Sequence, residues 1–458
     1  MPAALTQIYA EFIAGTRPTG VPEAALAVAR LGFTDCAGVI LAGRNEDVVQ
    51  RLAGVVRAQG ATPASRLVLG AERASMVQAA LVGATASHAL DYDDFAFSNH
   101  PSAVLVPVIL AAADANGADG ARMAAAYVIG YEVWADLFLR EPGLYYERGW
   151  HPTAVLGPIG AAAAACVVLG LDTKATRNAL ALAASDAGGV FENFGTMAKP
   201  WHGGRTAAAG LNAAVLAAAG LEASATALEG GRGLLRALSP SGKVDLDTAP
   251  MLGTTWRSAA LRLNIKKYPT VGSSQRVIDA VLALRNAHAI EPARIRDVAA
   301  HISNRHQATM PFVNPKDAHQ AKFSLQFAVA SALVHGAVGF SELTDAAVQS
   351  AVIQALMPKI RSVTTDDYEP GWRDAAPFDV VHVTLDDGNV VSSPQLRRPK
   401  GHADLPLSIE ELRAKFMGCA AHGSAGTVDA GRLFEAMQRI DQLAGPRDIP
   451  VILSGDAM

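Results

Sequence analysis

Apolar segments rich in alanine, leucine and valine follow one another from about residue 21 to residue 235. Short stretches with glycine, proline or aspartate separate them, which is typical of packed helices joined by short loops. Alanine is the strongest intrinsic helix former, and Asp172 is a candidate N-cap. Helices are therefore predicted over these segments: 22–43, 74–90, 101–115, 120–140, 153–170, 173–187 and 205–220.

The pattern changes near residue 290. Residues 293–303 alternate apolar and polar side chains, which predicts a strand. Asp387 and Gly388 separate two β-branched runs, which predicts a hairpin. A helical stretch around 318–356 lies between these segments, and helical patterns return towards the C-terminus. The predicted fold class is mainly α: a large all-helical domain, 1–267 with 396–458, and a smaller α+β lid domain inserted over 268–395.

Composition, net charge and cysteine content limit the partners and the cellular location that are expected for the protein. Half of the 458 residues are apolar, and 18% are charged, against roughly 25% in an ordinary soluble domain. The net charge of −4 gives no basic excess, so no nucleic-acid partner is predicted. Three widely spaced cysteines, Cys36, Cys166 and Cys419, form no CxxC motif, which favours a reducing cytoplasmic location.

One segment calls for a membrane test, because residues 154–171 are apolar and charge-free over about the shortest length that spans a bilayer. The segment contains Pro158 and many alanines and glycines, so its hydrophobicity per residue is modest. A buried core helix is expected instead. The N-terminal segment lacks a basic leader and carries Glu11, which argues against a secretory signal. No membrane partner is predicted.

Polar residues gather at the ends of the apolar segments, in five short clusters: 91–94, 99–102, 149–153, 199–204 and 266–269. His100, His151 and Lys199 each directly precede a predicted helix or the turn leading into one. Helix N-termini present free N–H groups and partial positive charge, so several of them together favour anions. With the added histidines and lysines, these clusters predict a cationic pocket for a small di- or tricarboxylate.

The same residue types support proton transfer next to a carboxylate, where developing negative charge needs preorganised cations and donors. A neutral histidine takes a proton, and a protonated histidine or lysine returns one. Lys199 or Lys266 held near other cations would have a lowered pKa. Asp91 would orient a histidine and set its tautomer.

Two alternatives remain open at this point. Asp93, Asp94, His100 and His202 are chemically suitable metal ligands, but no close HxH or HxxxH spacing occurs, and no metal is predicted. A protein that binds a carboxylate without turning it over would carry the same basic residues.

The clusters, in this order, resemble the MmgE/PrpD family, which includes 2-methylcitrate dehydratase, cis-aconitate decarboxylase and iminodisuccinate epimerase. The resemblance implies a homodimer without metal or organic cofactor. The matching stretches run through most of the chain: SHALDYDD (87–94), HPSAVLVPVILAAAD (100–114), GYEVWADL (130–137), GWHPTAVLGPIGAAAA (149–164), MAKPWHGGRTAAAGLNAAVLA (197–217), KKYPTVGSSQRVIDA (266–280) and AKFSLQFAVA (321–330).

The resemblance also implies roles residue by residue. The family's active-site aspartate corresponds to Asp91, its two histidines to His100 and His151, and its two lysines to Lys199 and Lys266. These five are the predicted catalytic residues. The predicted substrate-binding residues are Asp94, His202, Lys267 and Ser273.

The chain departs from the family pattern at several places. Phe95 stands where many members have threonine, and 269–271 with Gln275 replace a P-S-C run and a histidine. Decarboxylases of the family also bring a tyrosine from the lid, whereas no tyrosine occurs here between Tyr268 and Tyr368. These departures make decarboxylation of cis-aconitate a weaker match than dehydration.

The predicted function is a cofactor-independent lyase, a dehydratase that acts on a small 2-hydroxy di- or tricarboxylate such as 2-methylcitrate. An epimerase or racemase of an imino- or amino-dicarboxylate is an alternative within the family, and so is a decarboxylase of a cis-aconitate-like acid. The assignment of base and acid stays open.

Overall fold

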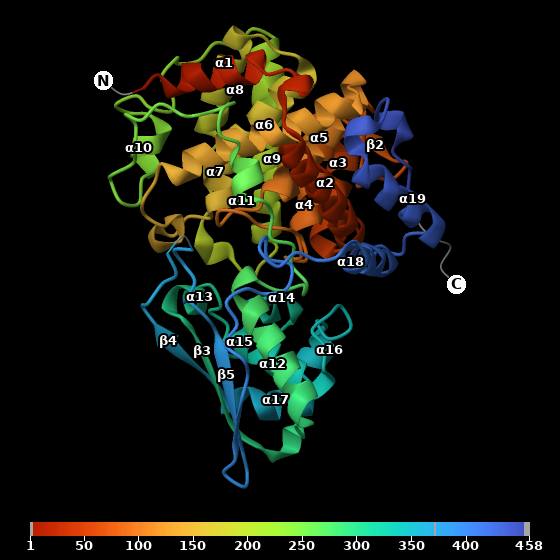
Figure 1. Cartoon of the computed structure of the whole chain (residues 1–458). Coiled ribbons are helices and arrows are strands. Elements are labelled where there is room, and N and C mark those ends of the chain that lie inside the picture. The colour runs from red at the N-terminus through yellow and green to blue at the C-terminus, as the bar shows by residue number, and fades with distance from the viewer. Residues whose placement is uncertain (1–2, 371, 453–458) are drawn as a thin grey trace. The chain divides into compact units, whose positions relative to one another are not determined.

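The computed structural model describes residues 3–370 and 372–452. The chain divides into two compact units, Met1–Leu263 with Ile409–Met458 and Asn264–Ser408 (Figure 1). The second unit extends past the predicted 268–395 domain at both ends. The cause is local pairing, because the Ile265 N–H donates to the Gly401 carbonyl, and the Ala403 N–H donates to Asn264 Oδ1.

The larger unit is almost entirely helical, and the predicted fold class, mainly α, is confirmed. Its helices are α1 (Leu5–Gly15), α2 (Glu23–Gly43), α3 (Asp47–Gln59), α4 (Met76–His88), α5 (Pro101–Asn116), α6 (Gly120–Leu139), α7 (Pro152–Leu169), α8 (Thr173–Ser185), α9 (Ala198–Ala218), α10 (Leu234–Leu238), α11 (Arg257–Leu261), α18 (Ile409–His422) and α19 (Thr427–Gln438). Two short strands, β1 (Ser65–Arg66) and β2 (Arg73–Ala74), form an antiparallel pair. The predicted N-cap at Asp172 is confirmed, because its side chain accepts from the Ala175 N–H at 2.8 Å.

Helices α2 and α7 are each long and apolar enough to cross a membrane. In this structure 72% and 89% of their apolar windows are buried inside the protein. A core helix passes the same test of length and composition, so these two helices are weak evidence for a membrane span. The buried core helix predicted for residues 154–171 is confirmed, with α7 ending two residues earlier at Leu169.

Close packing of α4 against α9 brings two of the polar clusters together. A Cβ atom at Gly204 of α9 would lie 2.5 Å from the Leu81 carbonyl oxygen of α4, so only glycine fits there. A Cβ atom at Gly203 would lie 3.4 Å from the Cβ of His88. The last turn of α4 and the first turns of α9 therefore lie side by side.

The predicted start of the helix at residue 205 is wrong, because α9 begins at Ala198. Pro200 lies in the first turn, where its missing N–H leaves no hydrogen bond unmade. Lys199 is therefore part of the first turn of the helix and does not precede it.

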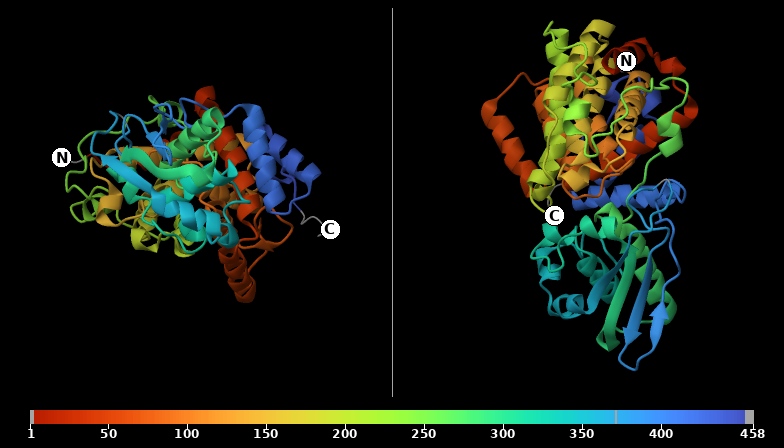
Figure 2. Two further views of the ribbon diagram at one scale, coloured as in Figure 1. Left: turned by 90° about the horizontal axis from the view of Figure 1, so that it is seen from below. Right: turned by 90° about the vertical axis from the view of Figure 1, so that its left-hand side faces the viewer.

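The smaller unit is built on a four-stranded sheet in the order β4-β3-β5-β6. β3 runs parallel to β4 and antiparallel to β5, and the predicted hairpin at Asp387 and Gly388 joins β5 to β6. Helices α12 and α15 pack on one face of the sheet (Figure 2). The elements are α12 (Gln275–His288), β3 (Ile295–Ser303), α13 (Asn304–Ala308), α14 (Ala318–Ala321), α15 (Leu325–His335), α16 (Asp345–Val348), α17 (Ala351–Leu356), β4 (Ile360–Thr365), β5 (Val380–Leu385) and β6 (Val390–Ser392).

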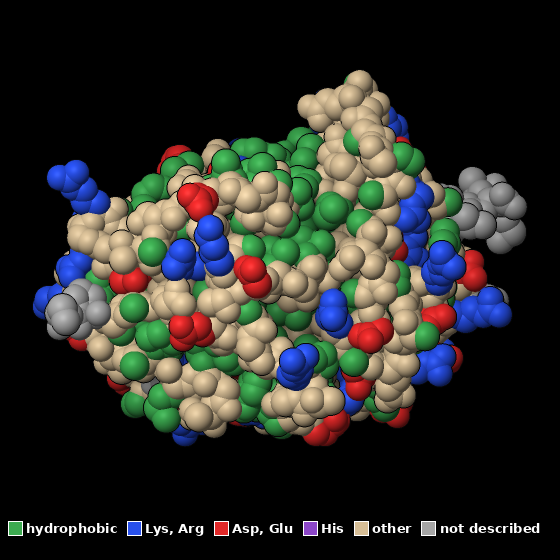
Figure 3. Space-filling view, turned by 90° about the horizontal axis from the view of Figure 1, so that it is seen from above, with side chains coloured by type: hydrophobic (Ala, Val, Ile, Leu, Met, Phe, Trp, Pro, Cys, Tyr) green, Lys and Arg blue, Asp and Glu red, His purple; other side chains and the backbone are tan. Residues whose placement is uncertain are grey.

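Nucleic-acid binders carry a basic region on their surface. On the face drawn in Figure 3, Lys and Arg side chains alternate with Asp and Glu among apolar groups. This face therefore offers no continuous basic surface. The absence of a nucleic-acid partner stays a prediction.

Candidate active site

Four helix ends of the larger unit carry the histidines and the lysine of the candidate site. His88 is the last residue of α4, and His100 and His151 are the N-cap residues of α5 and α7. Each N-cap histidine is followed by proline at the first helical position, and neither imidazole caps its own helix. Lys199 and His202 lie in the first turns of α9. The imidazoles are therefore available to contact one another.

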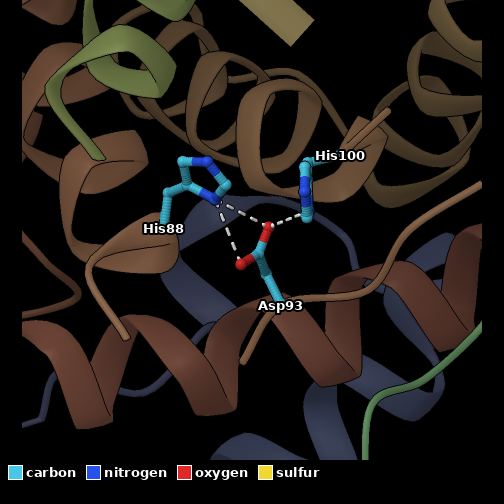
Figure 4. A group of neighbouring side chains, drawn as sticks. All are labelled: His88, Asp93 and His100. Atoms are coloured by element: carbon cyan, nitrogen blue, oxygen red, sulfur yellow. Dashed lines mark hydrogen bonds and ion pairs between the residues drawn. The ribbon is translucent and has the colours of Figure 1, made fainter. Parts of the chain in front are cut away.

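The centre of the cluster is the carboxylate of Asp93, which lies between two imidazoles (Figure 4). His88 Nδ1 lies 3.0 Å from Asp93 Oδ2, and His100 Nδ1 lies 2.7 Å from the same oxygen. His100 Nδ1 also lies 3.0 Å from the Asp94 carbonyl oxygen. A carbonyl only accepts, so Nδ1 of His100 carries a proton and donates.

The electrostatics of the group favour an ionised Asp93 and a neutral His88. Burial alone would raise the pKa of Asp93, but the imidazoles of His88 and His100 hold it well below its ordinary value. Burial and then the charge of Lys199 lower the pKa of His88 to about 4. At neutral pH, His88 therefore donates from Nδ1 to Asp93 and keeps the Nε2 lone pair.

A second imidazole pair adjoins the first. His151 Nδ1 lies 3.3 Å from His202 Nδ1, and the ring of His151 stacks on His88 with centroids 5.8 Å apart. The His151 ring also packs edge-to-face against the Phe194 ring, with the two centroids 5.0 Å apart. Burial and the positive charge of Lys199 lower the pKa of His151 well below its ordinary value. His151 is therefore a second neutral imidazole.

Lys199 forms an ion pair with Asp91, and both side chains are buried. The ammonium also lies 5.1 Å from the centroid of the Phe194 ring. Asp91 has a φ of 51°, a left-handed conformation that is uncommon for a residue other than glycine. Asp91 faces Lys199, and Asp93 contacts the two histidines. The role predicted for Asp91 in orienting a histidine stays a prediction.

Two basic nitrogens of the cluster lack a protein partner. Within residues 3–370 and 372–452, His88 Nε2 and His151 Nε2 are buried and make no hydrogen bond. An unmade hydrogen bond of a buried polar group is unfavourable, so such atoms call for a ligand. Next to the Lys199 ammonium, they form a site suited to binding an anion and moving a proton.

Asp94 belongs to a different polar group. Its carboxyl accepts a hydrogen bond from Ser102, whose Oγ lies 2.7 Å from the Tyr127 hydroxyl. Burial and the nearby carboxylates of Asp35 and Asp93 raise the pKa of Asp94 well above its ordinary value. The structure thus gives Asp94 a hydroxyl partner, and its role in substrate binding stays a prediction.

Two carboxylates lie among the basic residues of the cluster. Asp91 pairs with Lys199, and Asp93, whose pKa the two imidazoles lower, lies beside the neutral His88. The cationic pocket stays a prediction.

Lys266, Lys267 and Ser273 lie in the smaller unit. Lys266 is buried, Lys267 Nζ lies 3.8 Å from Asp279 Oδ1, and Ser273 Oγ lies 2.7 Å from Thr309 Oγ1. Their catalytic and substrate-binding roles stay predictions.

Gln275, which replaces the histidine of the family pattern, fixes the loop that carries these lysines. Its Oε1 accepts from the N–H groups of Lys267 and Tyr268, and its Nε2 donates to the carbonyls of Tyr268 and Thr270. The glutamine therefore satisfies four backbone groups of the loop.

Sequence reasoning missed the two residues at the centre of the site. His88 was not singled out, and Asp93 was considered only as a metal ligand. A usable signal was present, because His88 lies at the end of a predicted helix and the acidic run 91–94 follows at once.

His88, Asp93 and His100 also have the composition of a metal site. Their ligand atoms lie within 4.8 Å of one another, the one such group found among the described residues. The separations of 2.7 to 3.1 Å are ordinary hydrogen-bond lengths, so these residues satisfy one another as they stand. The prediction of no metal stays a prediction.

The histidine protonation states can be tested directly. Burial and the charge of Lys199 lower the pKa of His88 to about 4. Burial and the charge of Arg205 lower the pKa of His202 to about 4. We expect ¹⁵N spectra of both imidazoles to keep the neutral pattern from pH 7 down to about pH 5. A protonation midpoint near the ordinary value of about 6.5 for either residue would contradict this assignment.

Comparison with known proteins agrees with the sequence resemblance. Residues 7–247 match the MmgE/PrpD N-terminal domain, and residues 268–440 match the MmgE/PrpD C-terminal domain. The chain is 27% identical over 435 residues to cis-aconitate decarboxylase of Mus musculus, covering 91% of this chain and 87% of that protein. It is 30% identical over 393 residues to cis-aconitate decarboxylase of Homo sapiens, covering 82% and 79%. The chain therefore belongs to the MmgE/PrpD family.

Proposed function

We propose that this chain is a cofactor-independent decarboxylase of a cis-aconitate-like tricarboxylate. The observation that carries the proposal is the similarity to cis-aconitate decarboxylases over most of both chains. The buried imidazoles with unpartnered Nε2 atoms beside Lys199 support it. This proposal puts the decarboxylase ahead of the dehydratase that the sequence alone favoured.

The chemistry requires one proton donor. In cis-aconitate, the bond between the methylene carbon and its carboxylate breaks and releases CO2. The electron pair of that bond forms a new double bond to the central carbon. The pair of the original double bond takes a proton at the far carbon. The trianion and one proton thus give CO2 and an unsaturated dianion.

The cluster can supply that proton once an anion is bound. Burial and the neighbouring positive charge keep the pKa of His88 and of His151 low in the free protein. A bound carboxylate brings negative charge close to these rings and favours their protonated form. One Nε2–H then donates to the substrate carbon, while the Lys199 ammonium holds a carboxylate. The catalytic role predicted for Lys266 is kept as a proposal.

Dehydration of a 2-hydroxy acid such as 2-methylcitrate is the second candidate. The observation that favours it is the absence of tyrosine between Tyr268 and Tyr368, in the domain from which the family's decarboxylases bring one. Dehydration needs a base for the C–H proton and an acid for the leaving hydroxyl. The Nε2 atoms of His88 and His151 would provide both.

One labelling experiment separates these reactions. Uniformly ¹³C-labelled cis-aconitate is incubated with the protein in D2O and followed by NMR. We expect labelled CO2 and a five-carbon product carrying one deuterium on the methylene carbon next to a carboxylate. The control is 2-methylcitrate under the same conditions. Loss of water from 2-methylcitrate, with no CO2 from cis-aconitate, would reject the decarboxylase and support the dehydratase.

The homodimer and the cytoplasmic location are also proposals. The dimer rests on the family resemblance, and the location rests on the cysteine content. An epimerase of an imino- or amino-dicarboxylate would show deuterium wash-in at the substrate carbon without loss of CO2 or water.

A further inference from the structure

We propose that the ion pair of Lys415 and Asp35 positions Asp93, and through it the imidazoles of His88 and His100. This inference rests on the proposed function, because it assigns positioning residues to the same proton-transfer site. Both residues come from helices outside the five clusters: Asp35 from α2 and Lys415 from α18.

The ammonium of Lys415 is buried against the turn that follows α4. Its Nζ lies 2.6 Å from Asp35 Oδ1 and donates to the Tyr92 carbonyl at 2.9 Å. It also lies 4.1 Å from the centroid of the Tyr92 ring. The Lys415 side chain is 5% exposed and the Asp35 side chain 1% exposed, so the pair is shielded from solvent.

Asp35 is the buried partner that holds the Lys415 ammonium in place. Burial raises the pKa of Asp35, and the Lys415 ammonium, 2.6 Å from Oδ1, opposes that shift. Tyr92 directly precedes Asp93 in the chain. The ion pair therefore holds the carbonyl of the residue next to Asp93.

This turn needs external support. Asp91 adopts a left-handed φ of 51°, which is unfavourable for a residue with a Cβ and persists only where surrounding contacts impose it. The Asp93 carboxylate must also accept from both imidazoles at 2.7 to 3.0 Å. Small rotations of the backbone at Tyr92 or Asp94 would break one of these hydrogen bonds.

A buried ion pair is weak evidence for stability, because loss of hydration offsets much of the attraction between the charges. Removing one partner leaves an unpaired charge, whereas removing both is often tolerated. The double variant Asp35→Asn/Lys415→Met therefore separates positioning from stability, since it removes both charges of this pair and also the donor to the Tyr92 carbonyl.

The experiment compares the wild type with Lys415→Met, Lys415→Arg and the double variant in the full chain. Thermal melting, kcat and KM for cis-aconitate, and ¹⁵N spectra of the imidazoles are measured. The matched control is Arg66→Met, which breaks another buried ion pair of the larger unit, with Asp114. Among residues 3–370 and 372–452, that pair makes no hydrogen bond or ion pair with the turn 91–94.

We expect the double variant to melt near the wild type and to lose at least 10-fold in kcat, with mixed tautomers at His88 and His100. Lys415→Arg, which keeps the charge, should recover part of the kcat. Arg66→Met should lower the melting temperature and leave the tautomers unchanged. Wild-type tautomers in the folded double variant would overturn the proposal. Because the spectra need no substrate, this outcome is distinct from a failure of the proposed decarboxylation.

Discussion

Replacing Asp93 by asparagine is expected to reduce kcat by about 10,000-fold, the size of effect seen when a carboxylate that sets a histidine tautomer is replaced by an amide. The carboxylate accepts from Nδ1 of both His88 and His100. An amide offers one oxygen and an NH2 group, so it accepts from one ring and donates to the other. The ring that faces the amide NH2 must accept at Nδ1, so its proton moves to Nε2. That ring then has no Nε2 lone pair to act as a base.

The matched control is Asp94→Asn, one residue along the same turn. The raised pKa of Asp94 favours its neutral acid form, which an amide resembles in shape and charge. We expect this variant to retain turnover within a few-fold of the wild type. ¹⁵N spectra of the imidazoles should show altered tautomers in Asp93→Asn only. Equal loss of turnover in both variants would contradict the assignment and would support the predicted substrate contact of Asp94.

Replacing Lys199 by methionine is expected to reduce kcat/KM by about 100- to 1,000-fold, the usual effect of removing one preorganised group that stabilises developing charge. The Lys199 ammonium is buried beside His88 and His151 and is the cation of the cluster that a substrate carboxylate would meet. Its loss should raise KM as well as lower kcat, because it binds the ground state too.

Stability must be separated from function in this variant. Lys199→Met leaves Asp91 as a buried charge without its ion-pair partner, which typically destabilises by about 3 to 5 kcal/mol. The double variant Asp91→Asn/Lys199→Met removes both charges and should regain melting temperature without regaining turnover. The surface control is Lys174→Met, which breaks an exposed pair with Glu222. Turnover in the double variant close to the wild type would contradict a role for Lys199.

The sequence was informative where the cause of structure is local. The apolar run of 154–171 predicted a core helix, Asp172 predicted a cap, and Asp387 with Gly388 predicted a hairpin, and the structure confirms all three. The resemblance to the MmgE/PrpD family was also correct. Each of these predictions depends on residues that are neighbours along the chain.

The roles of Asp91 and Asp93 could not be obtained in that way. Both are acidic and lie two residues apart, a spacing that puts side chains on one face of a strand but on different sides of a helix. In the folded chain Asp91 has a left-handed φ of 51°, and its carboxylate pairs with Lys199 while the Asp93 carboxylate contacts the imidazoles. That conformation depends on tertiary contacts, so its consequence appears only in the folded protein.

The absence of a side chain at Gly204 determines how closely α9 packs against α4 beside this site. α9 approaches α4 so closely that a single methyl group at position 204 would overlap the Leu81 carbonyl oxygen. The two helices carry Lys199 and His88, so the close approach that Gly204 permits also sets how far apart this cation and this imidazole lie. A larger residue at position 204 would therefore change the distance between Lys199 and His88 without replacing either residue.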